Sequence, residues 1–220
     1  MTVNKYKWNQ ISRVPASEGV YAWYLPLKLS KKDIEIVTQR VITFKEQGKP
    51  ISAKDTIREF VNSKILNFYN EEPYKATLEG ALKPKYIGKV FHEATVSDSL
   101  VDRLFNDPIR IESVGKILIE TAPNFASPIY IGMASNLQNR LKKHKTLIEK
   151  YTTKSFLAIE NNQLLDEDKR DHNFAMRVVN RGIPETEMFV YIQEISNGGD
   201  IYKDIENLLN RINYPVLGRN

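Results

Sequence analysis

The stretch SPIYIGMASNLQNRLKKH, residues 127–144, holds three side chains whose types and spacing could do chemistry together. Tyr130 is expected near the end of a strand, because the run before Gly132 is rich in β-forming residues. Arg140 follows Gly132 by eight residues, and His144 follows Arg140 by four, about one helical turn. A phenol, a guanidinium and an imidazole aimed at one point can bind a phosphate and move a proton.

A helix must position the arginine and the histidine. Ser135 and Gln138 have the spacing of a capping box, which predicts a helix over residues 136–151 directly after the strand. Its expected buried stripe consists of Leu137, Leu141 and Ile148. Arg140 and His144 then lie at the edge of that stripe, near the rim of the sheet.

The rest of the chain predicts an α+β fold, a small mostly antiparallel sheet flanked by helices. Strands are expected over residues 18–26, 84–91, 113–122, 127–134 and 185–195. Helices are expected over 29–50 with a Ser30–Asp33 capping box, after a similar Ser52–Asp55 pattern, over 97–105, within 166–182, and over 201–212 capped by Asp200.

Composition narrows the class of protein. The 220 residues are 41% hydrophobic and 27% charged, which is ordinary for a globular chain, and there is no cysteine. The lack of cysteine excludes disulfides and thiolate metal sites. No apolar run reaches the roughly 18 residues of a membrane span, and MTVNKYKWNQ is no signal peptide, so we expect a cytoplasmic protein without a membrane partner.

The charge is compatible with an anionic partner. The formal net charge is +5, and Lys142, Lys143 and Lys145 lie beside Arg140 within two helical turns. A solvated helix face would show the same cluster.

Four segments together resemble the GIY-YIG nuclease superfamily: GVY at residues 19–21, YIG at 130–132, NLQNRLKKH, and ENLLNRINYP near the carboxyl end. The intervals from Gly132 to Arg140, from Arg140 to His144 and from Glu206 to Pro215 are those of the family. The resemblance implies one nuclease domain, residues 1–220, with a GIY-YIG-like core. By the same resemblance, residues 27–127 would be an insertion between the first two core strands that serves in DNA recognition or dimerisation.

The resemblance also implies a chemistry, the hydrolysis of DNA phosphodiester bonds with Mg²⁺, or Mn²⁺ in its place. Glu206 would be the metal ligand, beside a predicted apolar stripe of Ile201, Ile205, Leu208, Leu209 and Ile212, with Asp204 on the opposite flank. Arg140 would contact the phosphate, and Lys142, Lys143 and Lys145 the surrounding DNA.

The tyrosines have two assignments that the sequence leaves open. Tyr21 would activate water, directly or through His144, while Tyr130 holds the phosphate or the water, or these roles are exchanged. The family's asparagine is also open, since Gly218 occupies its position and either Asn220 or Asn213 could replace it.

The same tripeptide occurs a second time, at residues 86–88. There the next arginine, Arg103, follows the glycine by fifteen residues, and Asp107 stands where a histidine would be needed. We therefore interpret Tyr86 as a strand residue of the insertion.

Within the superfamily the architecture favours a stand-alone restriction-type endonuclease, because we find no separate DNA-binding or repair module. A palindromic target would then imply a homodimer. The alternatives are a non-catalytic DNA-binding protein with the same fold, a repair or mobile-element nuclease, and an interaction domain whose motif matches are coincidental.

Overall fold

The computed structural model describes residues 3–27, 29–70, 73–81, 83–90, 96–153, 166–195 and 199–218. The chain is α+β, as predicted, with a small antiparallel sheet. It divides into two compact units, one of Met1–Pro26 with Pro123–Asn220 and one of Leu27–Ala122.

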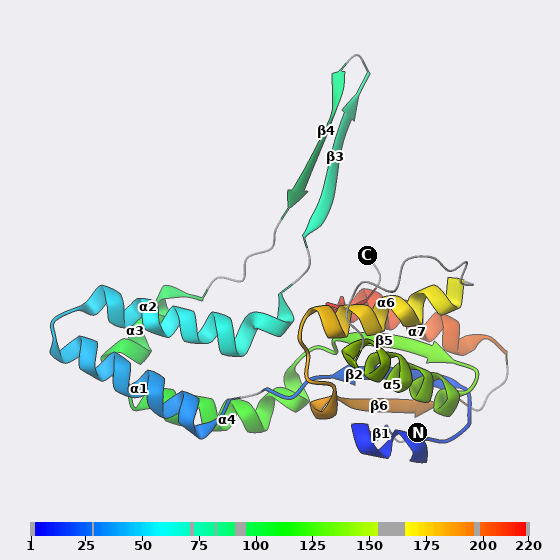
Figure 1. Cartoon of the computed structure of the whole chain (residues 1–220), viewed down its shortest axis with the longest axis horizontal. Coiled ribbons are helices and arrows are strands. Elements are labelled where there is room, and N and C mark those ends of the chain that lie inside the picture. The colour runs from blue at the N-terminus through cyan, green and yellow to red at the C-terminus, as the bar shows by residue number, and fades with distance from the viewer. Residues whose placement is uncertain are drawn as a thin grey trace. The chain divides into compact units, whose positions relative to one another are not determined.

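The first unit is built on a four-stranded sheet (Figure 1). Its strands are β1 (Asn4–Lys7), β2 (Gly19–Tyr24), β5 (Tyr130–Ala134) and β6 (Phe189–Glu194), in the spatial order β1-β6-β2-β5. All three neighbouring pairs are antiparallel, so β2 and β5 lie side by side although about a hundred residues separate them.

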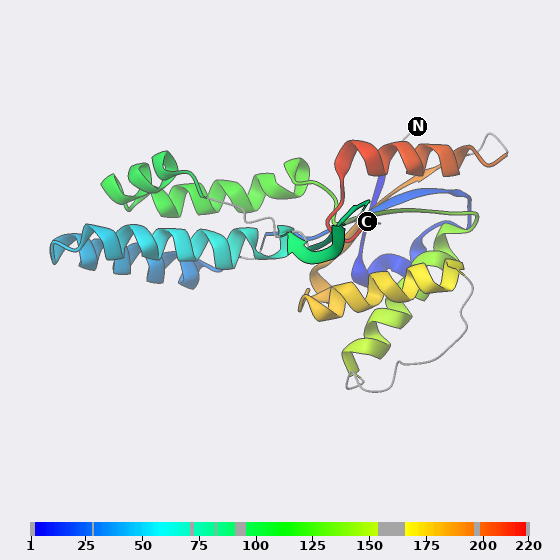
Figure 2. The ribbon, with the colours of Figure 1, turned by 90° about the horizontal axis from the view of Figure 1, so that it is seen from above.

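Helices cover both faces of this sheet. Figure 2 shows α5 (Leu137–Thr153) and α6 (Asp166–Asn180) on one face and α7 (Ile201–Asn213) on the other. Side chains alternate along β2, so Trp23 stacks on Phe174 of α6 while Val20 joins an apolar cluster with Tyr202 of α7.

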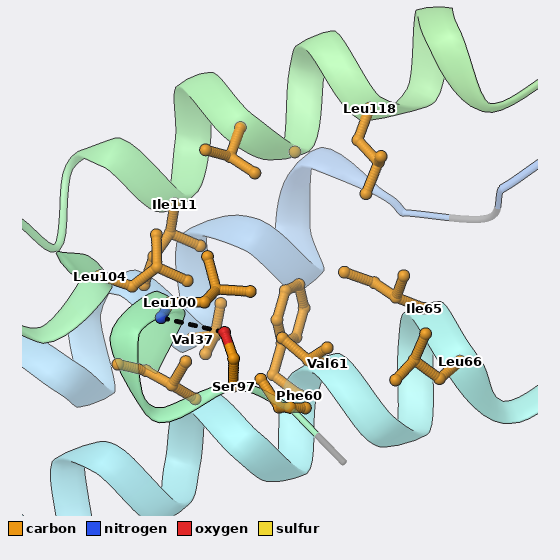
Figure 3. Close-up of a pocket in the computed structure, with 14 residues that line it drawn as sticks. Val37, Phe60, Val61, Ile65, Leu66, Ser97, Leu100, Leu104, Ile111 and Leu118 are labelled. Atoms are coloured by element: carbon orange, nitrogen blue, oxygen red, sulfur yellow. Dashed lines mark hydrogen bonds between the residues drawn. The ribbon is translucent and has the colours of Figure 1, made fainter. Parts of the chain in front are cut away.

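The second unit contains four helices and a hairpin among its described residues. The helices are α1 (Lys31–Glu46), α2 (Pro50–Phe60, continued by a π-helical turn Val61–Leu66), α3 (Asp98–Asn106) and α4 (Arg110–Phe125). The hairpin pairs β3 (Tyr74–Gly80) with β4 (Lys83–Val90). Figure 3 shows a cavity of about 460 Å³ among the helices, lined almost wholly by apolar side chains such as Phe60, Leu100 and Leu118.

The strand predicted over residues 113–122 is wrong, because these residues lie in α4. The β-branched residues there suggested a strand, yet Ile117 is exposed while Ile111, Gly115 and Ala122 are buried at helical spacing. Gly115 lies against α1, where a Cβ would come within 2.8 Å of Ile34.

Of the helix starts predicted at Ser30, Ser52 and Asp200, only the first has the expected capping bonds. The Ser30–Asp33 capping box of α1 is confirmed, with the Asp33 amide donating to the Ser30 hydroxyl at 3.0 Å. The pattern at Ser52 does not cap α2, which begins at Pro50, a residue suited to the first helical position because it lacks an N–H. Asp200 precedes α7 without a capping bond and instead pairs with Lys203.

Candidate active site

Strands β2 and β5 bring the two motif tyrosines together. In their register Tyr21 is opposite Gly132, and Trp23 is opposite Tyr130. The side chains of Tyr21, Trp23 and Tyr130 therefore point to the same face of the sheet. The ring centroids of Tyr21 and Tyr130 are 6.2 Å apart. Tyr130 is the first residue of β5, which corrects the expectation that it lies at the strand's end.

The glycines of both motifs are required by close packing. A Cβ built at Gly132 would lie 2.5 Å from the hydroxyl oxygen of Tyr21 and 2.9 Å from the ring of Tyr130. One built at Gly19 would overlap the carbonyl oxygen of Gln193 on β6. Gly132 therefore makes room for the Tyr21 hydroxyl, and Gly19 lets β2 approach β6.

Helix α5 carries Arg140 and His144 to this hydroxyl. It begins at Leu137, and its cap is Asn136, whose side chain accepts from the Asn139 amide at 2.9 Å; the predicted Ser135–Gln138 capping box is wrong. Gln138 instead donates to the carbonyl oxygens of Ser12 and Val14, at 3.1 and 2.9 Å, at the end of the short 3-10 helix Trp8–Arg13.

The predicted stripe of α5 is confirmed, and His144, Leu147 and Tyr151 of the same helix are buried as well. Leu137, Leu141 and Ile148 are fully buried, and His144 lies among them with 0% exposure rather than at the edge. The positions follow the i, i+4, i+7, i+11 spacing of one helix face. Arg140 is half-buried, as its place beside the stripe predicts.

Three hydrogen bonds connect these groups in a chain. Arg140 Nε donates to the Tyr21 hydroxyl oxygen at 3.5 Å, and that oxygen lies 3.4 Å from His144 Nε2. Trp23 Nε1 donates to His144 Nδ1 at 3.3 Å. The indole nitrogen can only donate, so Nδ1 carries no proton and the neutral imidazole carries its proton on Nε2. His144 therefore donates to Tyr21, whose oxygen accepts two hydrogen bonds.

This geometry narrows the assistance that His144 can give to Tyr21. The sequence suggested that the imidazole accepts a proton or orients the hydroxyl. Accepting a proton would place N–H groups on both ring nitrogens and break the bond from Trp23. The arrangement therefore favours orientation and donation.

The two tyrosines of β2 have different surroundings. Tyr24, on the other face, stacks on Phe189 with centroids 5.4 Å apart, and burial, together with nearby Tyr191, raises its pKa above the ordinary value. Tyr21 is also buried, with 2% exposure, but its oxygen lies within hydrogen-bond distance of Arg140 Nε and His144 Nε2.

Two aromatic residues of the site were missed in the sequence. Phe174 of α6 packs with its ring centroid 4.4 Å from Tyr130 and 4.8 Å from His144. Trp23 fixes the histidine tautomer. The signal for Trp23 was its place two residues after Tyr21 on the same strand face; Phe174 had only its position in a predicted amphipathic helix.

Glu206 lies in a different part of the unit. It is on α7, which covers the face opposite α5 and α6, and it is 9% exposed, so its side chain turns inward as predicted (Figure 2). Asp204 is exposed. The predicted stripe is only partly right, because Ile201, Leu208 and Ile212 are exposed and the buried positions are Tyr202 and Glu206. No described contact joins the Glu206 carboxylate to Tyr21 or Arg140.

A metal would have to be held with few protein ligands. Among the described residues no three His, Asp or Glu side chains gather. A single inward carboxylate such as that of Glu206 fits Mg²⁺, which keeps several waters and shares its remaining positions with substrate phosphates.

The segment expected to hold the asparagine runs beside β5. The Leu217 amide donates to the Ile129 carbonyl oxygen at 2.7 Å, directly before Tyr130. Gly218 has no room for a side chain, since a Cβ would lie 2.7 Å from the Pro215 ring. Asn213 donates its side-chain amide to the Leu209 carbonyl oxygen at 3.0 Å, and Asn220 lies outside the described residues.

The three candidate DNA-binding lysines differ in their surroundings. Lys142 is exposed. Lys145 is held between Glu149, at 3.8 Å, and the ring of Trp8, 5.6 Å from its ammonium. Lys143 is half-buried. Lys142 is therefore the most accessible of the three to a long anionic ligand.

Comparison of the chain with protein-family models, curated proteins and solved structures finds no significant match. Among the helices that the structure describes, none is long and apolar enough to cross a membrane.

Proposed function

We propose that this chain is a divalent-metal-dependent DNA endonuclease with a GIY-YIG-like core, which hydrolyses phosphodiester bonds. The observation that carries the proposal is the convergence of Arg140 and His144 on the Tyr21 oxygen, across 119 and 123 residues of sequence. The family resemblance, which rests on the sequence alone, points to these same residues and to Tyr130. Chance matches to short motifs would not be expected to meet at one atom.

Arg140 is the group best placed to bind a phosphate. It is half-buried, whereas Tyr21 and His144 behind it are almost fully buried. Its Nε bond to Tyr21 holds the guanidinium plane in place. A guanidinium oriented in this way can donate two parallel hydrogen bonds to phosphate oxygens and stabilise charge that develops there.

Tyr21 is the proton acceptor in this proposal. Acting as a tyrosinate, it would take a proton from the attacking water as the water oxygen bonds to phosphorus; one P–O ester bond breaks, and the leaving oxygen takes up a proton from solvent. Tyr130, supported by the Phe174 ring 4.4 Å away, would hold the phosphate in line.

Glu206 would hold the Mg²⁺, with Mn²⁺ as an alternative. The bound ion would supply positive charge to the phosphoryl oxygens. The protein's part is the inward carboxylate on α7.

Because the insertion lies within the proposed nuclease domain, we favour a restriction-type enzyme in which residues 27–127 contribute to DNA recognition. Cutting both strands of a palindromic site would require two copies of the chain. Lys142 would add sequence-independent attraction to the duplex.

A second candidate, a DNA-binding protein that does not cleave, is favoured by one specific observation. Glu206 lies on α7, and no described contact connects it with the tyrosine–arginine cluster on the other face. A site without its metal ligand could still bind a phosphate through Arg140.

One experiment separates these candidates. Purified protein is incubated with mixed plasmid and phage DNA in Mg²⁺ or EDTA, beside Glu206→Gln and its exposed neighbour Asp204→Asn as a matched control. Discrete fragments that require Mg²⁺, persist in Asp204→Asn and vanish in Glu206→Gln support the restriction-type enzyme. A smear supports a nuclease without sequence preference. Intact DNA that is still bound at low salt supports the non-cleaving protein.

A further inference from the structure

The β3–β4 hairpin of the second unit is a two-stranded ribbon (Figure 1), and its two faces carry different side chains. Its register pairs Lys75 with Lys89, Ala76 with Gly88, Thr77 with Ile87, and Leu78 with Tyr86. Since side chains alternate along each strand, one face carries Lys75, Thr77, Ile87 and Lys89, with the Glu79–Lys85 ion pair at the register shift, and the other carries Ala76, Leu78, Tyr86 and Val90. We call the first the lysine face.

The lysine face contains an unfavourable pair. Lys75 and Lys89 are directly opposite each other, and like charges in such positions destabilise an antiparallel pair. Lys85 is compensated by Glu79, with 2.5 Å between the charged atoms. Among the described residues neither Lys75 nor Lys89 makes an ion pair. An anion across the ribbon would remove this repulsion.

Within the part of the chain that the structure describes, β3 and β4 pair with no further strand. An isolated two-stranded hairpin is marginally stable in water, and its side chains here are exposed, Leu78 by 71% and Tyr86 by 59%. A two-stranded ribbon has the width that the major groove of B-DNA admits. The charge of the lysine face and the width of the ribbon therefore both fit duplex DNA.

We propose that the β3–β4 ribbon is a DNA-binding arm whose lysine face lies on duplex DNA, with Lys75 and Lys89 on phosphate oxygens. This inference rests on the proposed function and deepens it, because it assigns DNA recognition within residues 27–127 to a particular element.

The test uses the full chain in EDTA, so that no cleavage occurs. Affinity for a fluorescein-labelled 30-base-pair duplex is measured by anisotropy between 50 and 200 mM KCl. The variant Lys75→Gln/Lys89→Gln is compared with Lys32→Gln/Lys116→Gln, which removes two exposed lysines of the same unit, on α1 and α4, and matches the change in charge.

If the lysine face binds phosphates, the ribbon variant loses two contacts. The slope of log K against log salt then falls by about 1.8 and affinity at 0.1 M salt by roughly tenfold or more, while the control variant keeps the wild-type slope. Equal slopes for the two variants, with wild-type protein binding in a salt-dependent way, would overturn the arm and leave the nuclease standing. Wild-type protein without salt-dependent binding would overturn both.

A second measurement distinguishes DNA from a second copy of the chain as the ribbon's partner. Sedimentation of wild-type protein is compared with that of Leu78→Ser/Tyr86→Ser. A dimer that dissociates in this variant, together with an unchanged salt slope in the lysine variant, would assign the ribbon to contact between copies and contradict the proposal.

Discussion

The tripeptide Tyr-Ile-Gly occurs twice in this chain, and the two copies have different surroundings. Both lie on strands that pair in antiparallel fashion, at residues 130–132 on β5 and 86–88 on β4. Tyr130 is 8% exposed and Tyr86 is 59% exposed. A Cβ at Gly132 would collide with Tyr21, whereas at Gly88 no atom of the described residues lies within 4 Å.

The difference teaches that the tripeptide specifies a strand but not a site. The copy at residues 130–132 is followed by a helix that returns Arg140 and His144 to the neighbouring tyrosine. After the other copy the next arginine, Arg103, is an exposed residue of α3. What lies against the strand determines whether its tyrosine can take part in chemistry.

The largest effect is expected from the arginines. Arg140→Ala should lower the rate of DNA cleavage by about 10²–10³-fold, as does removal of one preorganised donor to a developing negative charge. Arg103→Ala should leave the rate unchanged. Initial rates on a supercoiled plasmid in Mg²⁺ measure both, and equal losses in the two variants would contradict the assignment of Arg140.

The next largest effect is expected from the glycines of the two tripeptides. Gly132→Ala should lower the free energy of unfolding by about 1–3 kcal/mol, because the added methyl group must displace the buried Tyr21 ring. Gly88→Ala should change it by less than about 0.5 kcal/mol. Urea unfolding followed by circular dichroism compares the two, and a neutral Gly132→Ala would show that the strands can separate to admit a side chain.

The tryptophan should have a smaller effect on cleavage and a specific one on His144. Trp23→Phe removes a neutral hydrogen bond of about 0.5–1.5 kcal/mol, so the cleavage rate should fall by roughly tenfold at most. Nitrogen-15 NMR of the imidazole should show the proton on Nε2 in the wild type and a mixture of tautomers in the variant. A proton on Nδ1 in the wild type would contradict the hydrogen-bond chain.

The smallest effect concerns α5, the helix that follows the copy at residues 130–132. Asn136→Ala should cost about 1 kcal/mol of stability, because it removes the cap of α5. Ser135→Ala should change stability by less than about 0.5 kcal/mol. Thermal unfolding measures both, and the reverse order would restore the capping box first predicted from the sequence.

Local pattern was sufficient for much of the fold. Strands β2, β4, β5 and β6 and helices α1, α2, α3, α5, α6 and α7 were predicted from periodicity and end signals, although the start of α2 at Pro50 was not. Residues 113–122 failed because β-branched side chains at exposed helical positions look the same in sequence as those of a strand. Strands β1 and β3 have few buried apolar residues, so they lacked a hydrophobic signal.

The site was predictable where residues are fixed by short spacing and not where distant segments meet. The placement of Arg140 and His144 side by side could be predicted, because residues four apart lie about one helical turn apart. The burial of His144 could not be predicted, because a histidine is compatible with an exposed position until a partner is known, and its partner Trp23 is 121 residues away. The placement of Glu206 on the opposite face likewise depends on how α7 packs.

The cleavage rates of Tyr130→Phe and Tyr86→Phe test the central claim most directly. Each change removes one hydroxyl group, so both variants should remain folded with circular dichroism spectra like that of the wild type. We expect Tyr130→Phe to lose Mg²⁺-dependent cleavage of plasmid DNA by at least about 10²-fold and Tyr86→Phe to cut at the wild-type rate. Full cleavage by a folded Tyr130→Phe would contradict the claim that this cluster is the active site.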